Sequence, residues 1–103
     1  QEFGIVVFDL NGLKTINDVK GHDAGDEYII EGSQIICQIF QHSPVYRIGG
    51  DEFVAFLRAG DYESRDRLLS NFEKMMEENL LDNKVVISSG LVIYESGSNL
   101  KGK

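Results

Sequence analysis

Two short apolar runs lie on either side of Gly49, Gly50, Asp51 and Glu52, in the stretch YRIGGDEFVAF. Apolar runs of this length, separated by a short glycine-containing connection, predict a β-hairpin. The hairpin fixes two neighbouring antiparallel strands and places both acids at its tip. Two interpretations of the tip stay open. In one, the glycines allow positive φ and the acids only keep an exposed edge soluble; in the other, a reaction needs the acids there.

Strands and helices alternate along the rest of the chain. The run FGIVVF, residues 3–8, is apolar without alternation, which predicts a central strand buried on both faces by helices. Apolar periodicity predicts two helices and a last strand, over residues 23–40, 62–81 and 85–94. Asp23 and Asp61 are the expected N-caps of the two helices. This order predicts an α/β fold, a mixed-sheet α/β sandwich with helices packed against the sheet.

Composition limits the classes of protein to consider. A chain of 103 residues has room for one domain. Its net charge of -7 repels a nucleic-acid backbone, so no nucleic-acid partner is expected. No apolar run approaches the roughly 20 residues of a membrane span, which predicts no direct membrane contact. Because Cys37 is the only cysteine and no leader opens the chain, a cytoplasmic location is expected.

Two acids far apart in the sequence are expected to meet. Asp9 closes the strand over residues 3–8, and Asp51 lies on the hairpin tip. If the hairpin lies beside that strand, the two carboxylates converge and repel each other unless a cation lies between them. Carboxylate oxygens with few other protein ligands, together with a phosphate substrate, suit Mg²⁺. The pair therefore predicts a Mg²⁺-dependent nucleotide site.

The segment after Asp9 is predicted to form the walls of that site. It turns into a short helical piece, so that the backbone N–H groups of Gly12 and Leu13 point at an anion and Lys14 adds positive charge. Asn17 is both donor and acceptor and Asp26 only accepts, which suits the N1–H and N2 amine edge of guanine. The alternative is that Asn17 caps a turn and Asp26 is a first-turn helix acid.

Three motifs stand out in this chain: DLNGLKTINDVKGHDAGD, then RIGGDEF, then ISSG. With these motifs, in this order and spacing, the chain closely resembles the GGDEF family of diguanylate cyclases. The resemblance spans nearly all of residues 1–103. It implies a palm-like βααββαβ sandwich of the nucleotide-cyclase type, with the signature on a β-hairpin. It also implies the condensation of two GTP into cyclic di-GMP with release of pyrophosphate, in bacterial second-messenger signalling, by a homodimer in which each subunit presents one GTP.

The resemblance also implies roles for individual residues. The metal ligands, for two Mg²⁺ ions with Mn²⁺ as the alternative, are Asp9, Asp51 and the carbonyl of Leu10. Phosphate contacts fall to Gly12, Leu13 and Lys14, guanine contacts to Asn17 and Asp26, and Gly50 lets the nucleotide approach the hairpin. The expected catalytic residues are Asp51, Glu52 and Lys14, where Glu52 supports the metal and ribose side of the site.

Three departures from the family pattern shape the expectations. The stretch FQHSPVY, residues 40–46, lacks the Arg-x-x-Asp of the inhibitory product site, so no inhibition through that site is expected. The family's N-terminal lead-in is missing. So are its C-terminal helix, with a basic pair that grips the triphosphate, and its last strand. We therefore expect a fragment of a longer protein that binds GTP weakly and turns it over slowly when isolated.

Two other functions remain open. The same pocket could serve a catalytically silent GTP-binding module that regulates a larger signalling protein, or the domain could be a structural or dimerisation unit. Sensory or effector domains are expected in the parent protein, which could itself be anchored to a membrane.

Overall fold

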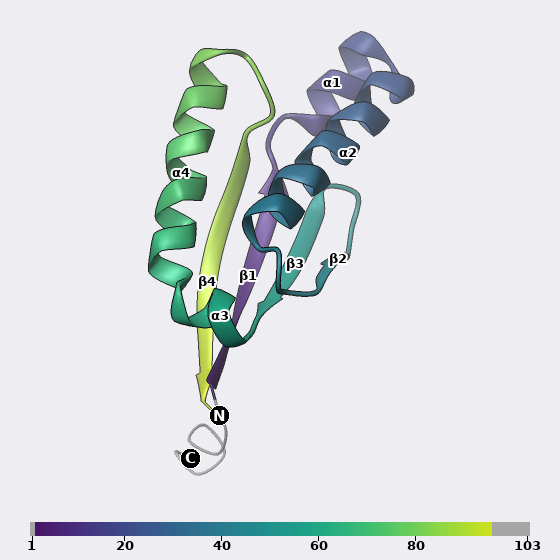
Figure 1. The fold of residues 1–103 in the computed structure, drawn as a ribbon. Helices are drawn as coiled ribbons and strands as arrows, with labels where there is room; N and C mark the ends of the chain where they lie inside the picture. Colours follow the sequence, from purple (N-terminus) through teal and green to yellow (C-terminus); the bar gives the residue numbers. More distant parts are fainter. Residues whose placement is uncertain (1, 96–103) are drawn as a thin grey trace.

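The computed structural model describes residues 2–95 of the chain. One sheet carries all the described strands, and helices pack on one of its faces (Figure 1). The elements in chain order are β1 (Glu2–Leu10), α1 (Leu13–Lys20), α2 (His22–Ile39), β2 (Val45–Arg47), β3 (Glu52–Leu57), α3 (Ala59–Glu63), α4 (Arg65–Leu81) and β4 (Ile87–Glu95). The order along the chain is the predicted one, with the second helical segment divided into α3 and α4.

The sheet has the strand order β2-β3-β1-β4, so the first strand of the chain lies between β3 and β4. Every pairing among these strands is antiparallel, where a mixed sheet was expected. The predicted hairpin is confirmed, because β2 and β3 pair with Val45 opposite Ala55. The last strand, expected over residues 85–94, begins at Ile87 and is continuous to Glu95.

The core lies between the sheet and the helices on one of its faces. Val6 and Phe8 of β1 are fully buried, as are Ile36 of α2 and Phe72 of α4. Three rings pack together at its centre: Phe8 and Phe72 have centroids 5.4 Å apart, and Phe8 and Phe40 5.7 Å apart. Since Phe8 lies in β1, Phe40 directly follows α2 and Phe72 lies in α4, this cluster joins both long helices to the same strand.

The prediction that β1 is buried on both faces is wrong for the part of the chain that the structure describes. Alternate residues of β1 point to opposite faces, so Val6 and Phe8 enter the core while Val7 is 41% exposed. On the same face as Val7, Tyr46 of β2 and Val92 of β4 are 55% and 49% exposed. The uniformly apolar sequence of β1 hid this difference. We call this surface the open face of the sheet.

Both predicted N-caps are wrong. Helix α2 begins one residue before Asp23, after Gly21, so Asp23 lies in the first turn. The helix dipole still stabilises a negative charge at this position. Asp61 lies inside α3 and is only 5% exposed. Its Oδ2 accepts hydrogen bonds from the His42 N–H (2.9 Å) and Ser43 Oγ (2.7 Å). Asp61 therefore fastens the loop before β2 to α3.

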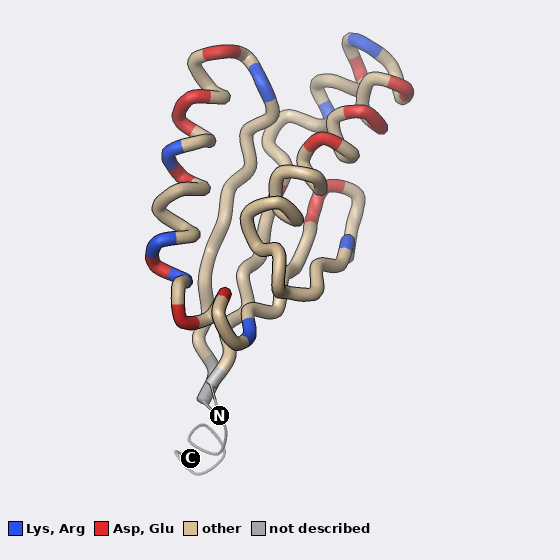
Figure 2. The backbone as a smooth tube through the Cα atoms, viewed as in Figure 1, with Lys and Arg blue, Asp and Glu red and all other residues tan. Residues whose placement is uncertain are grey.

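Acidic residues occur along α4 and along the first half of α2 (Figure 2). Acidic residues also lie where β3 begins. Within residues 2–95, no helix has the length and apolar character that crossing a bilayer requires.

Candidate active site

Asp9 and Asp51 come together at one end of the open face. Asp9 lies opposite Glu52 in the pairing of β1 with β3, and opposite Ser88 in the pairing of β1 with β4. The Leu10 N–H donates to the Asp51 carbonyl oxygen at 2.8 Å, which ties the hairpin tip to the end of β1. The side chains of Asp9 and Asp51 lie close enough that Asp51 affects the ionisation of Asp9. Two acids 42 positions apart in the sequence thus meet on neighbouring strands.

The environment of Asp9 favours its neutral form. Desolvation, and then the negative charge of Asp51, raise the pKa of Asp9 above its usual value. A divalent cation between the two carboxylates would offset their mutual repulsion.

The donor set fits Mg²⁺. This ion is commonly held by one or two carboxylates, completed by water and substrate phosphates. Residues 2–95 contain no group of three or more His, Cys, Asp or Glu side chains that could hold a metal by themselves. Asp9 and Asp51 supply the pair of carboxylates, and the adjacent Leu10 backbone is available for a carbonyl contact.

The hairpin turn is held by a residue that the sequence analysis missed. Arg47 donates from Nε to the Gly49 carbonyl (3.0 Å) and from Nη2 to the Gly50 carbonyl (2.9 Å). Neither glycine has positive φ, so backbone conformation is not what requires glycine here. A Cβ added to Gly50 would meet nothing within 4 Å, which leaves open space beside this residue. An arginine two positions before a glycine pair is the sequence signal that could have indicated these hydrogen bonds across the turn.

The segment predicted to bind phosphate turns sharply from β1 into α1. Gly12 is in the left-handed conformation, with φ 78°, and its carbonyl accepts the Ile16 N–H at 3.0 Å. The backbone N–H groups before Ile16 begin the helix and so have no carbonyl partner within it. Leu13 and Lys14 open α1, and the Lys14 side chain is exposed. The geometry leaves N–H groups and a cation available for an anion.

The two candidate guanine contacts lie where α1 and α2 pack together. Asn17 of α1 is half-buried, and its side chain rests on the backbone of Gly25 in α2. A Cβ on Gly25 would overlap Asn17 Oδ1 and lie 2.8 Å from Asn17 Cγ. Asp26, the next residue, is exposed. Gly25 therefore sets how closely Asn17 approaches the helix that carries Asp26.

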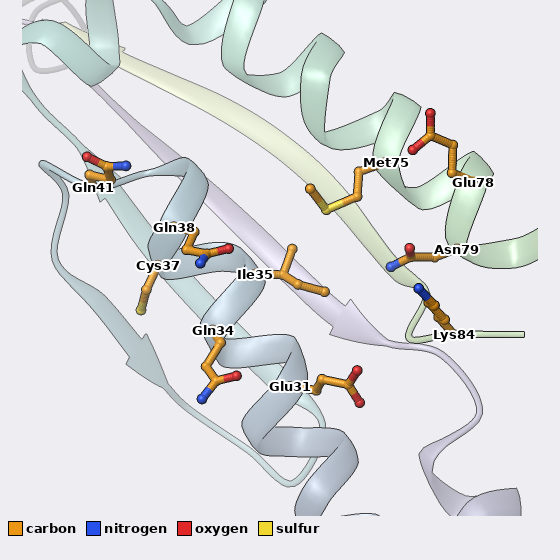
Figure 3. A pocket seen from close by; sticks show the side chains of 10 residues that line it. All are labelled: Glu31, Gln34, Ile35, Cys37, Gln38, Gln41, Met75, Glu78, Asn79 and Lys84. Carbon is orange, nitrogen blue, oxygen red and sulfur yellow. The ribbon is translucent and has the colours of Figure 1, made fainter. Parts of the chain in front are cut away.

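A pocket of about 970 Å³ lies elsewhere, between α2 and α4. Ile35 of α2 and Met75 of α4 point toward each other across it (Figure 3). Its lining includes none of the predicted site residues.

The stretch at residues 40–43 has structural roles in this protein. Phe40 is 1% exposed in the core, and Ser43 is bonded to Asp61.

Comparison with known proteins shows the family. The family model described as "Diguanylate cyclase, GGDEF domain" matches residues 1–102. The chain belongs to the GGDEF domain family, in agreement with the resemblance found in its motifs.

Named relatives and a solved structure agree with this assignment. MucR of Pseudomonas aeruginosa, a bifunctional diguanylate cyclase/cyclic di-GMP phosphodiesterase, is 26% identical over 99 residues, covering 91% of this chain and 14% of that protein. The diguanylate cyclase DosC of Escherichia coli is 36% identical over 75 residues, covering 68% of this chain and 16% of that protein. The chain thus spans a small part of these relatives.

The active GGEEF domain of a diguanylate cyclase from Vibrio cholerae has a similar structure, with a TM-score of 0.74 at 23% identity. The match covers 94% of this chain and 65% of that one. At this identity the likeness concerns the fold, and it confirms the predicted palm-like α/β architecture.

Proposed function

We propose that this domain condenses two GTP molecules into cyclic di-GMP and two pyrophosphates. The observation that carries the proposal is the contact between Asp9 and Asp51, directly beside the turn at Gly12 that opens α1. A pair of carboxylates next to free helix N–H groups brings a metal site and a phosphate site together, as nucleotidyl transfer requires. The assignment to the GGDEF family and the names of the relatives support this reaction.

In this account, the chain's residues bind and orient the nucleotide. The N–H groups of Gly12 and Leu13, with the Lys14 ammonium, hold the β- and γ-phosphates. Asn17 and Asp26 hydrogen-bond the guanine edge, while the open space at Gly50 admits the nucleotide to the hairpin. Glu52, opposite Asp9 in the sheet, supports the metal and ribose side of the site.

Asp9 and Asp51, with the Leu10 carbonyl, would hold Mg²⁺, for which Mn²⁺ could substitute. Two such ions bound there would supply Lewis acidity that acidifies a 3′-hydroxyl, and positive charge that neutralises the departing pyrophosphate. Each 3′-oxygen forms a bond to the α-phosphorus of the other GTP, the bond from that phosphorus to pyrophosphate breaks, and the hydroxyl proton is lost.

One domain presents one GTP, so the reaction needs two copies facing each other. We therefore propose that the active form is a homodimer within a larger cytoplasmic or membrane-anchored signalling protein.

Incubation of the full-length protein with GTP and Mg²⁺ tests the proposal. We expect cyclic di-GMP and pyrophosphate in a 1:2 ratio, detected by chromatography and mass spectrometry, and no product when EDTA is added. GTP binding without product would instead favour the regulatory module. Neither binding nor product would leave only a structural role.

A further inference from the structure

Tyr28 links three segments that are distant in the sequence. From α2, its hydroxyl donates to the Asn11 carbonyl oxygen at 2.6 Å and accepts the Val86 N–H at 3.3 Å. Asn11 lies between β1 and Gly12, and Val86 directly precedes β4. One hydroxyl group therefore joins α2, the predicted phosphate-binding turn and the approach to β4.

Asn11 is held at three of its polar groups. Besides its carbonyl, its N–H donates to the Val86 carbonyl at 2.9 Å, and its Oδ1 accepts from Ser88 Oγ at 3.1 Å. Of these three hydrogen bonds, only the one from Tyr28 acts on the Asn11 carbonyl. That carbonyl belongs to the peptide unit that joins Asn11 to Gly12.

That peptide unit determines where a phosphate-binding group points. A trans peptide is planar, with its carbonyl oxygen and its N–H on opposite sides. When Tyr28 fixes the Asn11 carbonyl on the α2 side, it also directs the Gly12 N–H to the opposite side. The N–H is the first of the backbone donors proposed for the triphosphate.

The peptide needs such a restraint because glycine follows it. Rotating the plane between Asn11 and Gly12 changes φ of Gly12, and glycine tolerates both signs of φ. In the structure Gly12 has φ 78°. Without a partner on the Asn11 carbonyl, little in the local backbone would prevent the plane from turning and withdrawing the N–H.

We infer that Tyr28 is a positioning residue for triphosphate binding, which it serves by orienting the Gly12 N–H through the Asn11 carbonyl. The inference rests on the proposed function, since it concerns the same nucleotide. Tyr28 makes no contact with substrate in this account, and its loss affects only the binding of the β- and γ-phosphates. The base, read from Asn17 and Asp26, does not depend on this peptide.

The test compares two ligands in the full-length protein and in its Tyr28→Phe variant. Dissociation constants are measured by calorimetry with Mg²⁺ for a non-hydrolysable α,β-methylene analogue of GTP and for GMP, which lacks the β- and γ-phosphates. We expect Tyr28→Phe to weaken the triphosphate roughly five- to tenfold, the value of about one hydrogen bond, and to change GMP affinity less than about twofold. Tyr46→Phe removes the same atom from β2, where the ring packs against Phe56, and serves as the matched control with both affinities kept.

Each other outcome contradicts a stated part of the account. Unchanged triphosphate affinity in Tyr28→Phe, with normal binding by the wild type, overturns the role of Tyr28 and leaves the proposed function standing. An equal loss for both ligands, accompanied by a lower melting temperature, shows a merely structural role and also overturns it. A wild-type protein that binds neither ligand refutes the proposed function, and the role of Tyr28 with it.

Discussion

Replacing Asp51 with asparagine is expected to reduce cyclic di-GMP formation about 10³-fold. The change keeps the shape of the side chain but removes one of the two charges proposed to hold the metal. Losing several kcal/mol of charge stabilisation in the transition state corresponds to a factor of this size. The measurement is the rate of product formation by the full-length protein with saturating GTP and Mg²⁺.

The fold should survive this substitution. The hairpin tip is held by the backbone bond from Leu10 to the Asp51 carbonyl and by Arg47, neither of which uses the Asp51 side chain. The raised pKa of Asp9 means that the folded state binds a proton more readily than the unfolded state, so stability falls as pH rises through that pKa. Desolvation is the largest cause of the shift and the charge of Asp51 the next, so removing that charge relieves part of this loss. The melting temperature in metal-free buffer at neutral pH should therefore not decrease.

Asp82→Asn is the matched control, because it removes one exposed carboxylate at the end of α4. We expect it to keep the wild-type rate. Retention of more than about one tenth of that rate by Asp51→Asn would show that the pair of carboxylates is not the metal site that the mechanism requires.

Gly25→Ala is expected to impair recognition of guanine more than stability. The new Cβ would occupy the place of the Asn17 carboxamide, which is the end of a short side chain and can rotate away. Alanine is also a better helix former than glycine, by about 1 kcal/mol. The helix should therefore persist while Asn17 leaves its position. Losing hydrogen bonds worth roughly 1–3 kcal/mol would reduce the preference for GTP over ATP about ten- to a hundredfold.

The measurement is the ratio of dissociation constants for non-hydrolysable GTP and ATP analogues in wild type and variant. Gly60→Ala in α3 makes the same change where a Cβ would meet nothing within 4 Å, so it should leave the ratio unchanged. An unaltered ratio in Gly25→Ala would remove Asn17 from the proposed guanine site.

Local sequence signals predicted the parts of this protein that depend on neighbouring residues. The glycines and acids between two short apolar runs indicated the β2–β3 hairpin, and the hairpin then brought Asp51 beside the strand that ends near Asp9. The approach of these two acids followed from topology. Their roles, and those of Lys14, Asn17 and Asp26, remain predictions.

Features that depend on tertiary packing could not be read in the same way. The apolar run of β1 gave no sign that one face lacks a helix among the described residues, because Val7 is as apolar as Val6. Asp61 resembled a helix cap, yet its partners lie in a loop 18 and 19 residues earlier. The sequence analysis assigned no role to Tyr28, and only the fold places its hydroxyl against Asn11.

The site itself can be tested by diffraction from crystals grown with Mn²⁺ and the α,β-methylene analogue of GTP. We predict an anomalous peak ligated by carboxylate oxygens of both residue 9 and residue 51, beside the β- and γ-phosphates and with the purine next to residues 17 and 26. Manganese bound to other side chains, with the two acids directed into separate regions of solvent, would contradict the account.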